Sequence, residues 1–186
     1  TALFLFILLD FPAHAIEVYQ FDPTHSYVTW HVSHFGYSQL SGKFFVTGTI
    51  VLDDKDQQKA RVNAEIDIAS LSTGITKFDA DLKGSDFFDA SRYPKASFIS
   101  YKVQLTGKDT AKVYGKLTIH GISKPAVLSI KLINMGSHPF YKKQAAGFAG
   151  STSLRRSSFG ITKYLPGVGD DVRIDIESEA LARAVY

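Results

Sequence analysis

Histidine is the residue type in this chain best suited to metal binding or to acid–base chemistry near neutral pH. His31 and His34 are three positions apart, an odd number, so on a regular strand their side chains face opposite sides of the sheet. His25 shares a face with His31, but the extended chain between them separates them by about 20 Å. We expect His120, beside Gly121, to bond a turn or a neighbouring side chain. The spacing predicts no metal site within a strand, and a zinc or haem site made across strands stays an alternative.

Asp86 and Asp89 are the carboxylates whose spacing could support general acid–base catalysis. They flank Phe87 and Phe88 near a predicted helical turn, where capping that turn is the expected role. The chain has no G-x-S-x-G or H-E-x-x-H motif, and its lack of cysteine excludes thiol catalysis, thiolate zinc sites and iron–sulfur clusters. We expect a binding protein with no catalytic residue, no metal and no required cofactor. A metal- or carboxylate-dependent enzyme acting on lipids is the less favoured alternative.

The net charge of +3 and the pI of about 9.0 come from dispersed basic residues. The densest pairs are Lys142-Lys143 and Arg155-Arg156, and no longer basic run of the kind that marks a nucleic-acid-binding arm is present. Weak basicity of this kind favours solubility and a transient contact with an anionic membrane surface. We expect no nucleic-acid partner.

The first fifteen residues have the pattern of a secretory signal peptide. Leu3 to Leu9 are all apolar, too few for the roughly 20 residues that span a bilayer, and Ala13-His14-Ala15 then fits a signal-peptidase site. Asp10 is unusual for such a segment, and the basic residues that normally precede the apolar run are not part of the sequence. We expect residues 1–15 to be cleaved on export and residues 16–186 to form one domain. A buried first strand or an interfacial anchor is the alternative.

Apolar and polar residues alternate with period two along most of the chain, the pattern of half-buried strands. Polar connections such as 53–56 and 106–109 separate the segments, and internal glycines such as Gly48 and Gly115 indicate bends in a curled sheet. About eight strands result, with a possible short one at 18–21. Closing such a sheet buries the apolar row of each strand and removes exposed edges. The expected fold is an all-β antiparallel barrel.

Residues 70–94 interrupt this alternation. Ile75, Phe78 and Leu82 have helical spacing, and Tyr93-Pro94 ends the segment. We expect a short helical insertion that caps the barrel or lies on its wall.

A barrel of about eight strands is either filled by its own side chains or holds one small ligand. The 14 phenylalanines and 9 tyrosines gather near predicted turns and at the insertion, where they could surround the mouth of a cavity. At about 25 cal/mol per Å² of buried apolar surface, a long isoprenoid chain would bind there without any charged contact. Each phenylalanine alone is better explained as core, so only the aromatics taken together favour a cavity.

A series of short motifs follows in order between about residues 19 and 181. They are DPTHS (22–26), HFGYS (34–38), GKF (42–44), STG (72–74), DADLK (79–83), DFFD (86–89), YP (93–94), LTIHG (117–121), KP (124–125), RSSFGI (156–161) and GVGDDV (167–172). No single motif is specific, but the ordered set resembles the YceI-like family of polyisoprenoid-binding proteins.

The resemblance implies an extended eight-stranded antiparallel lipocalin-like β-barrel around an apolar tunnel. It implies a periplasmic location in Gram-negative bacteria, a bound polyprenyl chain with a quinone, phenol or phosphate head or another long-chain amphiphile, and often a homodimer. Trp30 and Tyr37 stand where Phe is more frequent, and an inward Trp30 would narrow the tunnel. Residues 134–146 have no clear match and are expected to form a variable loop.

We expect the ligand to lie along the inward rows of several strands, with Phe35, Phe87 and Phe88 at the mouth or holding the insertion. The faces are assigned from parity alone, and one bulge reverses the faces beyond it. The alternative function is an interaction or scaffold partner of a membrane redox system, with a filled interior and no lipid. The candidate ligand-binding residues are Val28, Trp30, Val32, Phe35, Phe44, Val46, Ile66, Phe87, Phe88, Ile99, Tyr101, Leu117, Ile119, Leu128, Ile130, Phe148 and Phe159.

Overall fold

The computed structural model describes residues 16–53 and 56–183, so the expected signal peptide lies outside the described residues. Among the described residues, no helix has the length and apolar character needed to cross a bilayer. The strands are β1 Ile16–Phe21, β2 Tyr27–His34, β3 Ser38–Asp53, β4 Arg61–Asp67, β5 Lys95–Leu105, β6 Thr110–Ile119, β7 Ile122–Ser137, β8 Gln144–Arg155 and β9 Val168–Ala182. One α-helix, α1 Thr76–Lys83, and three 3₁₀ turns, η1 Gln57–Lys59, η2 Ile68–Ser70 and η3 Arg156–Phe159, connect them.

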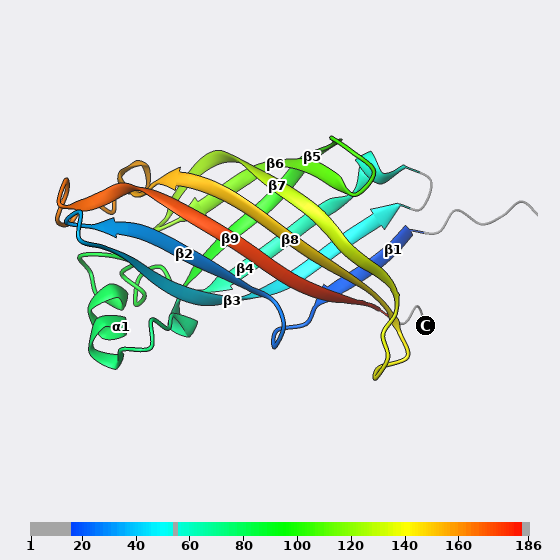
Figure 1. The fold of residues 1–186 in the computed structure, drawn as a ribbon, viewed down its shortest axis with the longest axis horizontal. Coiled ribbons are helices and arrows are strands. Elements are labelled where there is room, and N and C mark those ends of the chain that lie inside the picture. The colour runs from blue at the N-terminus through cyan, green and yellow to red at the C-terminus, as the bar shows by residue number, and fades with distance from the viewer. Residues whose placement is uncertain (1–15, 54–55, 184–186) are drawn as a thin grey trace, which may run out of the picture.

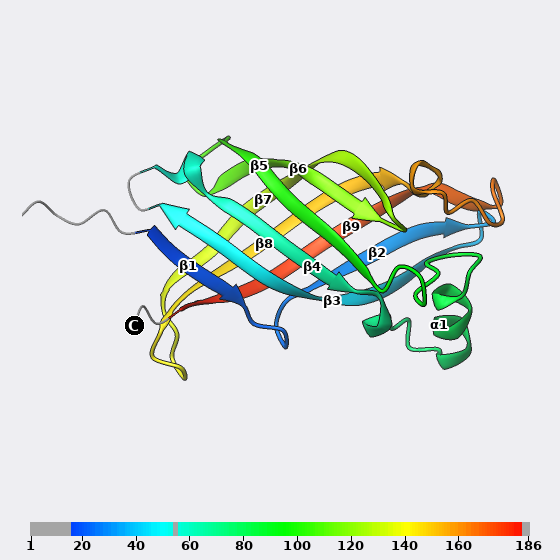
Figure 2. The same ribbon diagram turned by 180° about the vertical axis from the view of Figure 1, so that it is seen from behind.

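The strands form one antiparallel sheet that closes on itself. The order β3-β2-β9-β8-β7-β6-β5-β4 returns to β3 through the β3–β4 pairing, which makes eight strand positions (Figures 1 and 2). Closure follows from the alternating pattern, because each strand has one apolar row to bury and only a closed sheet has no edges. The all-β eight-stranded barrel expected from the sequence is confirmed.

β1 and β2 occupy one strand position, interrupted between residues 22 and 26. β1 pairs with the far half of β3 and the end of β9, while β2 pairs with the near half of β3 and most of β9. Ser26 is fully buried in the interruption, where its hydroxyl donates to the Glu179 carbonyl (2.9 Å) and accepts from the Glu179 amide (3.2 Å). Nine strands therefore fill eight positions, and the short first strand expected at 18–21 is part of β1.

The expected loop at 134–146 is wrong in extent. β7 continues to Ser137 and β8 begins at Gln144, and the two strands stay paired through Ser137 and Gln144. A bulge between Leu132 and Asn134 shifts the register within this hairpin. The bulge breaks the alternation of apolar and polar residues that is typical of a strand, so the sequence pattern does not predict this part of β7.

The helical insertion packs against one end of the barrel, beside the end of β2 and the start of β3 (Figures 1 and 2). α1 begins after a turn in which the Asp79 carboxylate accepts hydrogen bonds from the Thr73 amide (2.7 Å) and hydroxyl (2.6 Å). Leu82 is buried on the inner face of α1, in one cluster with Trp30 and Phe44. The expected insertion is confirmed, and we call this the helix end of the barrel.

The capping role expected for Asp86 is wrong. Its carboxylate forms an ion pair with Lys163 (3.0 Å), and the ring of Phe87 lies 6.2 Å from that of Tyr164. Asp89 accepts instead from the hydroxyl of Ser91 (3.0 Å). The insertion is thus joined to the β8–β9 connection by a charge pair and an aromatic contact, which sequence spacing alone could not reveal.

Arg156 holds the β8–β9 connection onto η3. It is 7% exposed, and its Nε, Nη1 and Nη2 donate to the carbonyls of Gly169 (2.7 Å), Ile161 (3.0 Å) and Val168 (2.9 Å). Burial lowers the pKa of this guanidinium, while the nearby Asp170 carboxylate opposes the effect. Three backbone carbonyls, one in the β8–β9 connection and two at the start of β9, therefore depend on one buried side chain.

We predict that Arg156→Met lowers the free energy of unfolding by about 2–3 kcal/mol, because the three carbonyls lose a charged donor. Arg155→Met is the matched control, since the neighbouring side chain is 69% exposed and donates only to Asp170 (2.9 Å). The control is expected to lose no more than about 1 kcal/mol. Urea unfolding followed by circular dichroism measures both, and equal losses would contradict the role given to Arg156.

A second prediction concerns the Asp22–His25 pair in the β1–β2 interruption. Burial alone would raise the pKa of Asp22, but hydrogen bonds from Thr24 and His25 outweigh it and lower the pKa from 3.8 to about 2. Because the folded-state pKa is the lower one, the stabilisation is complete above about pH 4 and is lost as the pH falls toward 2.

Asp22→Asn should therefore lower the free energy of unfolding by about 1 kcal/mol at pH 5 and by almost nothing at pH 2. Urea titrations at the two pH values provide the measurement, with Asp81→Asn on the exposed face of α1 as the control. A difference between Asp22→Asn and the wild type that is the same at both pH values would show that the carboxylate is not held by these bonds.

Candidate ligand cavity

The barrel encloses a cavity of about 670 Å³. This lies within the range of about 300–1,000 Å³ that is typical of small-molecule sites. Aliphatic and aromatic side chains from the inward rows make up nearly all of its wall, and the insertion adds Phe78, Leu82, Phe87 and Phe88 at the helix end. The interior is therefore hollow and apolar along its length.

Most of the residues proposed from the sequence do line this cavity. Their inward orientation follows from the strand parity, which holds along β2, the first part of β3, β6 and the centre of β7. Whether they contact a ligand stays a prediction. The residues that line the cavity are Val28, Trp30, Val32, Phe44, Val46, Ile66, Phe87, Phe88, Leu117, Ile119, Leu128, Ile130, Phe148 and Phe159.

Ile99 and Tyr101 do not line the cavity, and their proposed orientation is wrong. They are 47% and 58% exposed on the outer face of β5, whereas Phe98 and Val103 are buried and line the wall. The register of β5 against β6 shifts between Ser100 and Lys102, so the inward row runs through even-numbered positions before the bulge and through Val103 after it. Counting back from Val103 by twos gives the wrong face because of this extra residue.

Phe35 also lies outside the cavity wall. It stands in the β2–β3 turn with φ +49° and is 52% exposed. Its ring packs edge-on against His34 (4.8 Å between ring centroids) and covers Gly167, where a Cβ would lie only 2.3 Å from the ring. Phe35 thus braces the β8–β9 connection from outside and does not guard the mouth.

The histidines take the separate places that their spacing predicts. His34 lines the cavity at the helix end, whereas His31 points outward and pairs with Asp175 (3.1 Å). His120 closes the β6–β7 turn, with Nδ1 3.2 Å from the Phe159 carbonyl and its ring 4.6 Å from that of Tyr93. These contacts give His31 and His120 structural partners.

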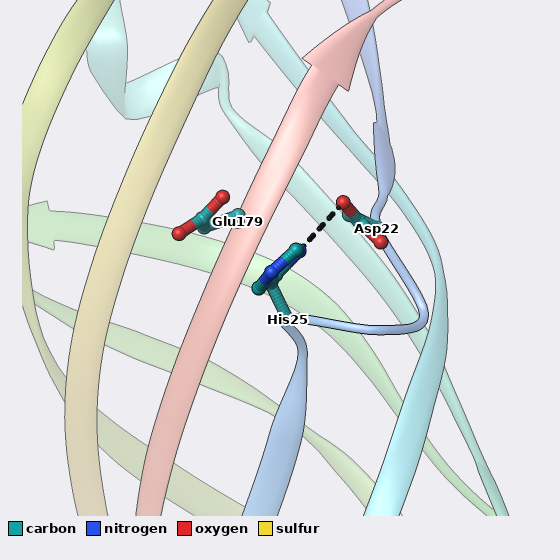
Figure 3. Close-up of side chains that lie close together, drawn as sticks. All are labelled: Asp22, His25 and Glu179. Atoms are coloured by element: carbon teal, nitrogen blue, oxygen red, sulfur yellow. Dashed lines mark hydrogen bonds and ion pairs between the residues drawn. The ribbon is translucent and has the colours of Figure 1, made fainter. Parts of the chain in front are cut away.

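One group that the sequence did not indicate combines Asp22 and His25 from the β1–β2 interruption with Glu179 from β9 (Figure 3). One ligand-type atom from each lies within 4.8 Å of the others. However, both oxygens of Asp22 already accept hydrogen bonds, one from the Thr24 amide and hydroxyl (2.9 and 2.7 Å) and the other from His25 Nδ1 (2.9 Å). The bond to Asp22 raises the pKa of His25, so the imidazole is favoured as a charged donor and disfavoured as a metal ligand.

Trp30 contributes an aromatic side chain to the cavity wall beside β3. Its indole lies flat over Gly42, where a Cβ would come within 2.6 Å of the ring, so only glycine fits opposite it. Its Nε1 is buried and has no hydrogen-bond partner within residues 16–53 and 56–183. Trp30 therefore points inward, and the narrowing of the tunnel that an inward tryptophan would cause stays a prediction. Because Trp30 is the single tryptophan of the chain, its fluorescence reports on the cavity directly.

The end of the cavity away from α1 has a different character. There the wall includes Glu17, Asp53, Asp109 and Lys108, contributed by the start of β1, the end of β3 and the β5–β6 turn. We call it the distal end. Carboxylates outnumber ammonium groups in this lining, and Asp109 is also paired with Lys131 (3.9 Å) outside it.

Comparison with known proteins places this barrel in a family. The YceI-like domain model matches residues 19–180. The UPF0312 protein of Pseudomonas savastanoi pv. phaseolicola is 37% identical over 160 residues, covering 86% of this chain and 82% of that protein. The UPF0312 protein of Vibrio campbellii is 33% identical over 179 residues, covering 95% and 92%.

Solved structures agree with these matches. The Campylobacter jejuni YceI protein superposes with a TM-score of 0.71 at 28% identity, covering 82% of this chain and 90% of that one. A domain of Saccharophagus degradans described as polyisoprenoid-binding superposes with a TM-score of 0.67 at 14% identity, covering 89% and 98%, a likeness of fold alone. The family match extends from β1 to β9 and includes every strand of the barrel, so the chain belongs to the YceI-like domain family.

Proposed function

We propose that this protein binds and carries a long-chain, largely apolar lipid of the polyisoprenoid type inside its barrel. The observation that carries the proposal is the cavity of about 670 Å³ with its apolar wall. Water in such a space would find few hydrogen-bond partners, whereas a hydrocarbon chain would contact the wall along its length.

The energetics favour a long chain over a short one. A tail that removes about 400 Å² of its own apolar surface from water would contribute roughly 10 kcal/mol at about 25 cal/mol per Å². Association costs several kcal/mol, and ordering a flexible chain costs more. A short tail would not offset these costs, so binding requires most of the cavity to be filled.

Three further observations support this reading. The Saccharophagus degradans domain with the same fold is described as polyisoprenoid-binding. Asp86 and Asp89 are engaged with Lys163 and Ser91, which favours binding over carboxylate catalysis. The leader pattern in residues 1–15 supports export to the periplasm, where a water-soluble container would be needed to move a lipid between membranes. The alternative function, a scaffold that binds no ligand, does not account for the apolar cavity.

The proposal predicts that the protein purified from its native host contains about one long-chain lipid per chain. Organic extraction followed by mass spectrometry identifies and counts the lipid, and a polyprenol added to delipidated protein should then quench or shift the Trp30 fluorescence. Lipid-free protein whose fluorescence does not respond to polyprenols would favour the scaffold function. Conversion of added polyprenyl esters or phosphates into products would favour an enzyme.

Ile119→Asp is predicted to reduce the bound lipid at least tenfold, because a carboxylate in the apolar wall must be desolvated when a lipid binds. Ile99→Asp is the matched control, since Ile99 lies on the outer face of the same barrel. If Ile119→Asp does not fold, as judged by circular dichroism, Ile119→Gln tests the same position without a charge. Undiminished lipid in a folded Ile119 variant would show that this stretch of the wall does not contact the ligand.

A further inference from the structure

The barrel has an opening in its side wall, between β7 and β8. The β7–β8 pairing ends at Ser129 and Ser151. Beyond that point, within the described residues, Ile122–Leu128 pair only with β6 and Thr152–Arg155 pair only with β9. A groove of about 840 Å³ lies between the two strands here. We call it the β7–β8 slot.

Only some of the backbone N–H and C=O groups along the slot have hydrogen-bond partners among the described residues. His120 and Gly121, with φ +52° and +73°, form a two-residue hairpin turn between Ile119 and Ile122. In an antiparallel pair, every second residue directs its N–H and C=O groups away from the partner strand. Residues 123, 125 and 127 of β7 therefore direct these groups away from β6 and toward the slot. Thr152 Oγ1 donates to the Val127 carbonyl (3.0 Å) as a single bridge. Pro125 has no N–H to leave unpaired, as expected of a strand edge without a neighbour.

The slot adjoins the main cavity. Leu117, Thr152, Leu154 and Phe159 line both spaces. An elongated ligand that moves these side chains apart would reach the outer surface without crossing either end of the barrel.

The outer part of the slot is polar and basic, unlike the cavity. Serine hydroxyls and three cations line it, with Asp175 as the single carboxylate. Arg173 is paired with Asp175 (3.0 Å), and Arg155 is paired with Asp170 (2.9 Å) outside the lining. Lys124 makes no ion pair with any carboxylate in the part of the chain that the structure describes. The slot thus offers a positive charge and hydroxyl donors, whereas the distal end offers carboxylates.

We infer that the β7–β8 slot holds the head group of the bound amphiphile, and that it selects an anionic head such as a phosphate or a carboxylate. The inference rests on the proposed lipid-binding function and adds the position and charge of the head. The tail lies in the apolar cavity, its path to the surface passes Leu117 and Leu154, and the head meets Lys124 and the slot hydroxyls. Attraction between the head and Lys124 is exposed to solvent and is therefore weakened by salt.

Two ligands with the same tail test the inference: geranylgeranyl phosphate and geranylgeraniol, titrated into delipidated protein with Trp30 fluorescence as the readout. The wild type should bind the phosphate more tightly than the alcohol, with a preference that shrinks between 50 and 500 mM salt. Lys124→Glu should weaken phosphate binding roughly five- to tenfold and leave alcohol binding unchanged. Lys124→Arg should retain the preference for the phosphate.

Lys143→Glu is the matched control, since it makes the same charge change on the exposed β7–β8 connection, outside the lining of both the cavity and the slot. It should leave the preference for the phosphate unchanged. Equal effects of Lys124→Glu and Lys143→Glu, or no effect of Lys124→Glu on phosphate binding, would overturn the assignment of the slot while leaving lipid binding intact. If the wild type binds neither ligand, the proposed function is wrong and the slot assignment falls with it.

Discussion

The whole structure depends on closing an antiparallel sheet whose inward side chains are too few to fill it. Closure pairs the backbone edges and hides the apolar rows from water, but eight strand positions leave a hollow of about 670 Å³. The wall of that hollow loses van der Waals contacts unless something fills it. A ligand that binds only the closed barrel therefore stabilises it, and the folded state and the bound lipid are thermodynamically linked.

Apart from the bulges, the described part of the sheet loses strand pairing at the β1–β2 interruption and at the β7–β8 slot, and the chemistry of the two places differs. In the β1–β2 interruption, Ser26 replaces the missing ladder bonds by pairing with both backbone groups of Glu179, and Asp22, Thr24 and His25 satisfy one another. At the β7–β8 slot, one threonine hydroxyl spans the opening. The polar groups in the β1–β2 interruption are hydrogen-bonded within the fold, whereas those at the β7–β8 slot remain available to a ligand.

The sequence was sufficient for the fold class, the helical insertion and most of the wall, because alternation survives wherever a strand is regular. It failed where the register shifts. Because of the bulge near Ser100, counting by twos predicts the wrong face for Ile99 and Tyr101. The bulge near Leu132 breaks the alternation, so the pattern does not predict a strand in the far half of β7. Each bulge lies opposite a glycine of the paired strand, Gly115 at Ser100 and Gly147 at Asn134, so its position depends on a pairing that the sequence alone does not show. The pairing of Lys163 with Asp86 and the end of the β7–β8 ladder are long-range features, which only the three-dimensional structure shows.

The two ends of the cavity differ in a way that constrains the ligand. At the helix end, Trp30, Phe44 and Leu82 form one buried apolar cluster. The distal end is acidic. A polar head is disfavoured at the first because it would lose its hydration against buried apolar side chains. A neutral head is compatible with the distal mouth, so the charge of the natural lipid decides whether the side opening is used at all.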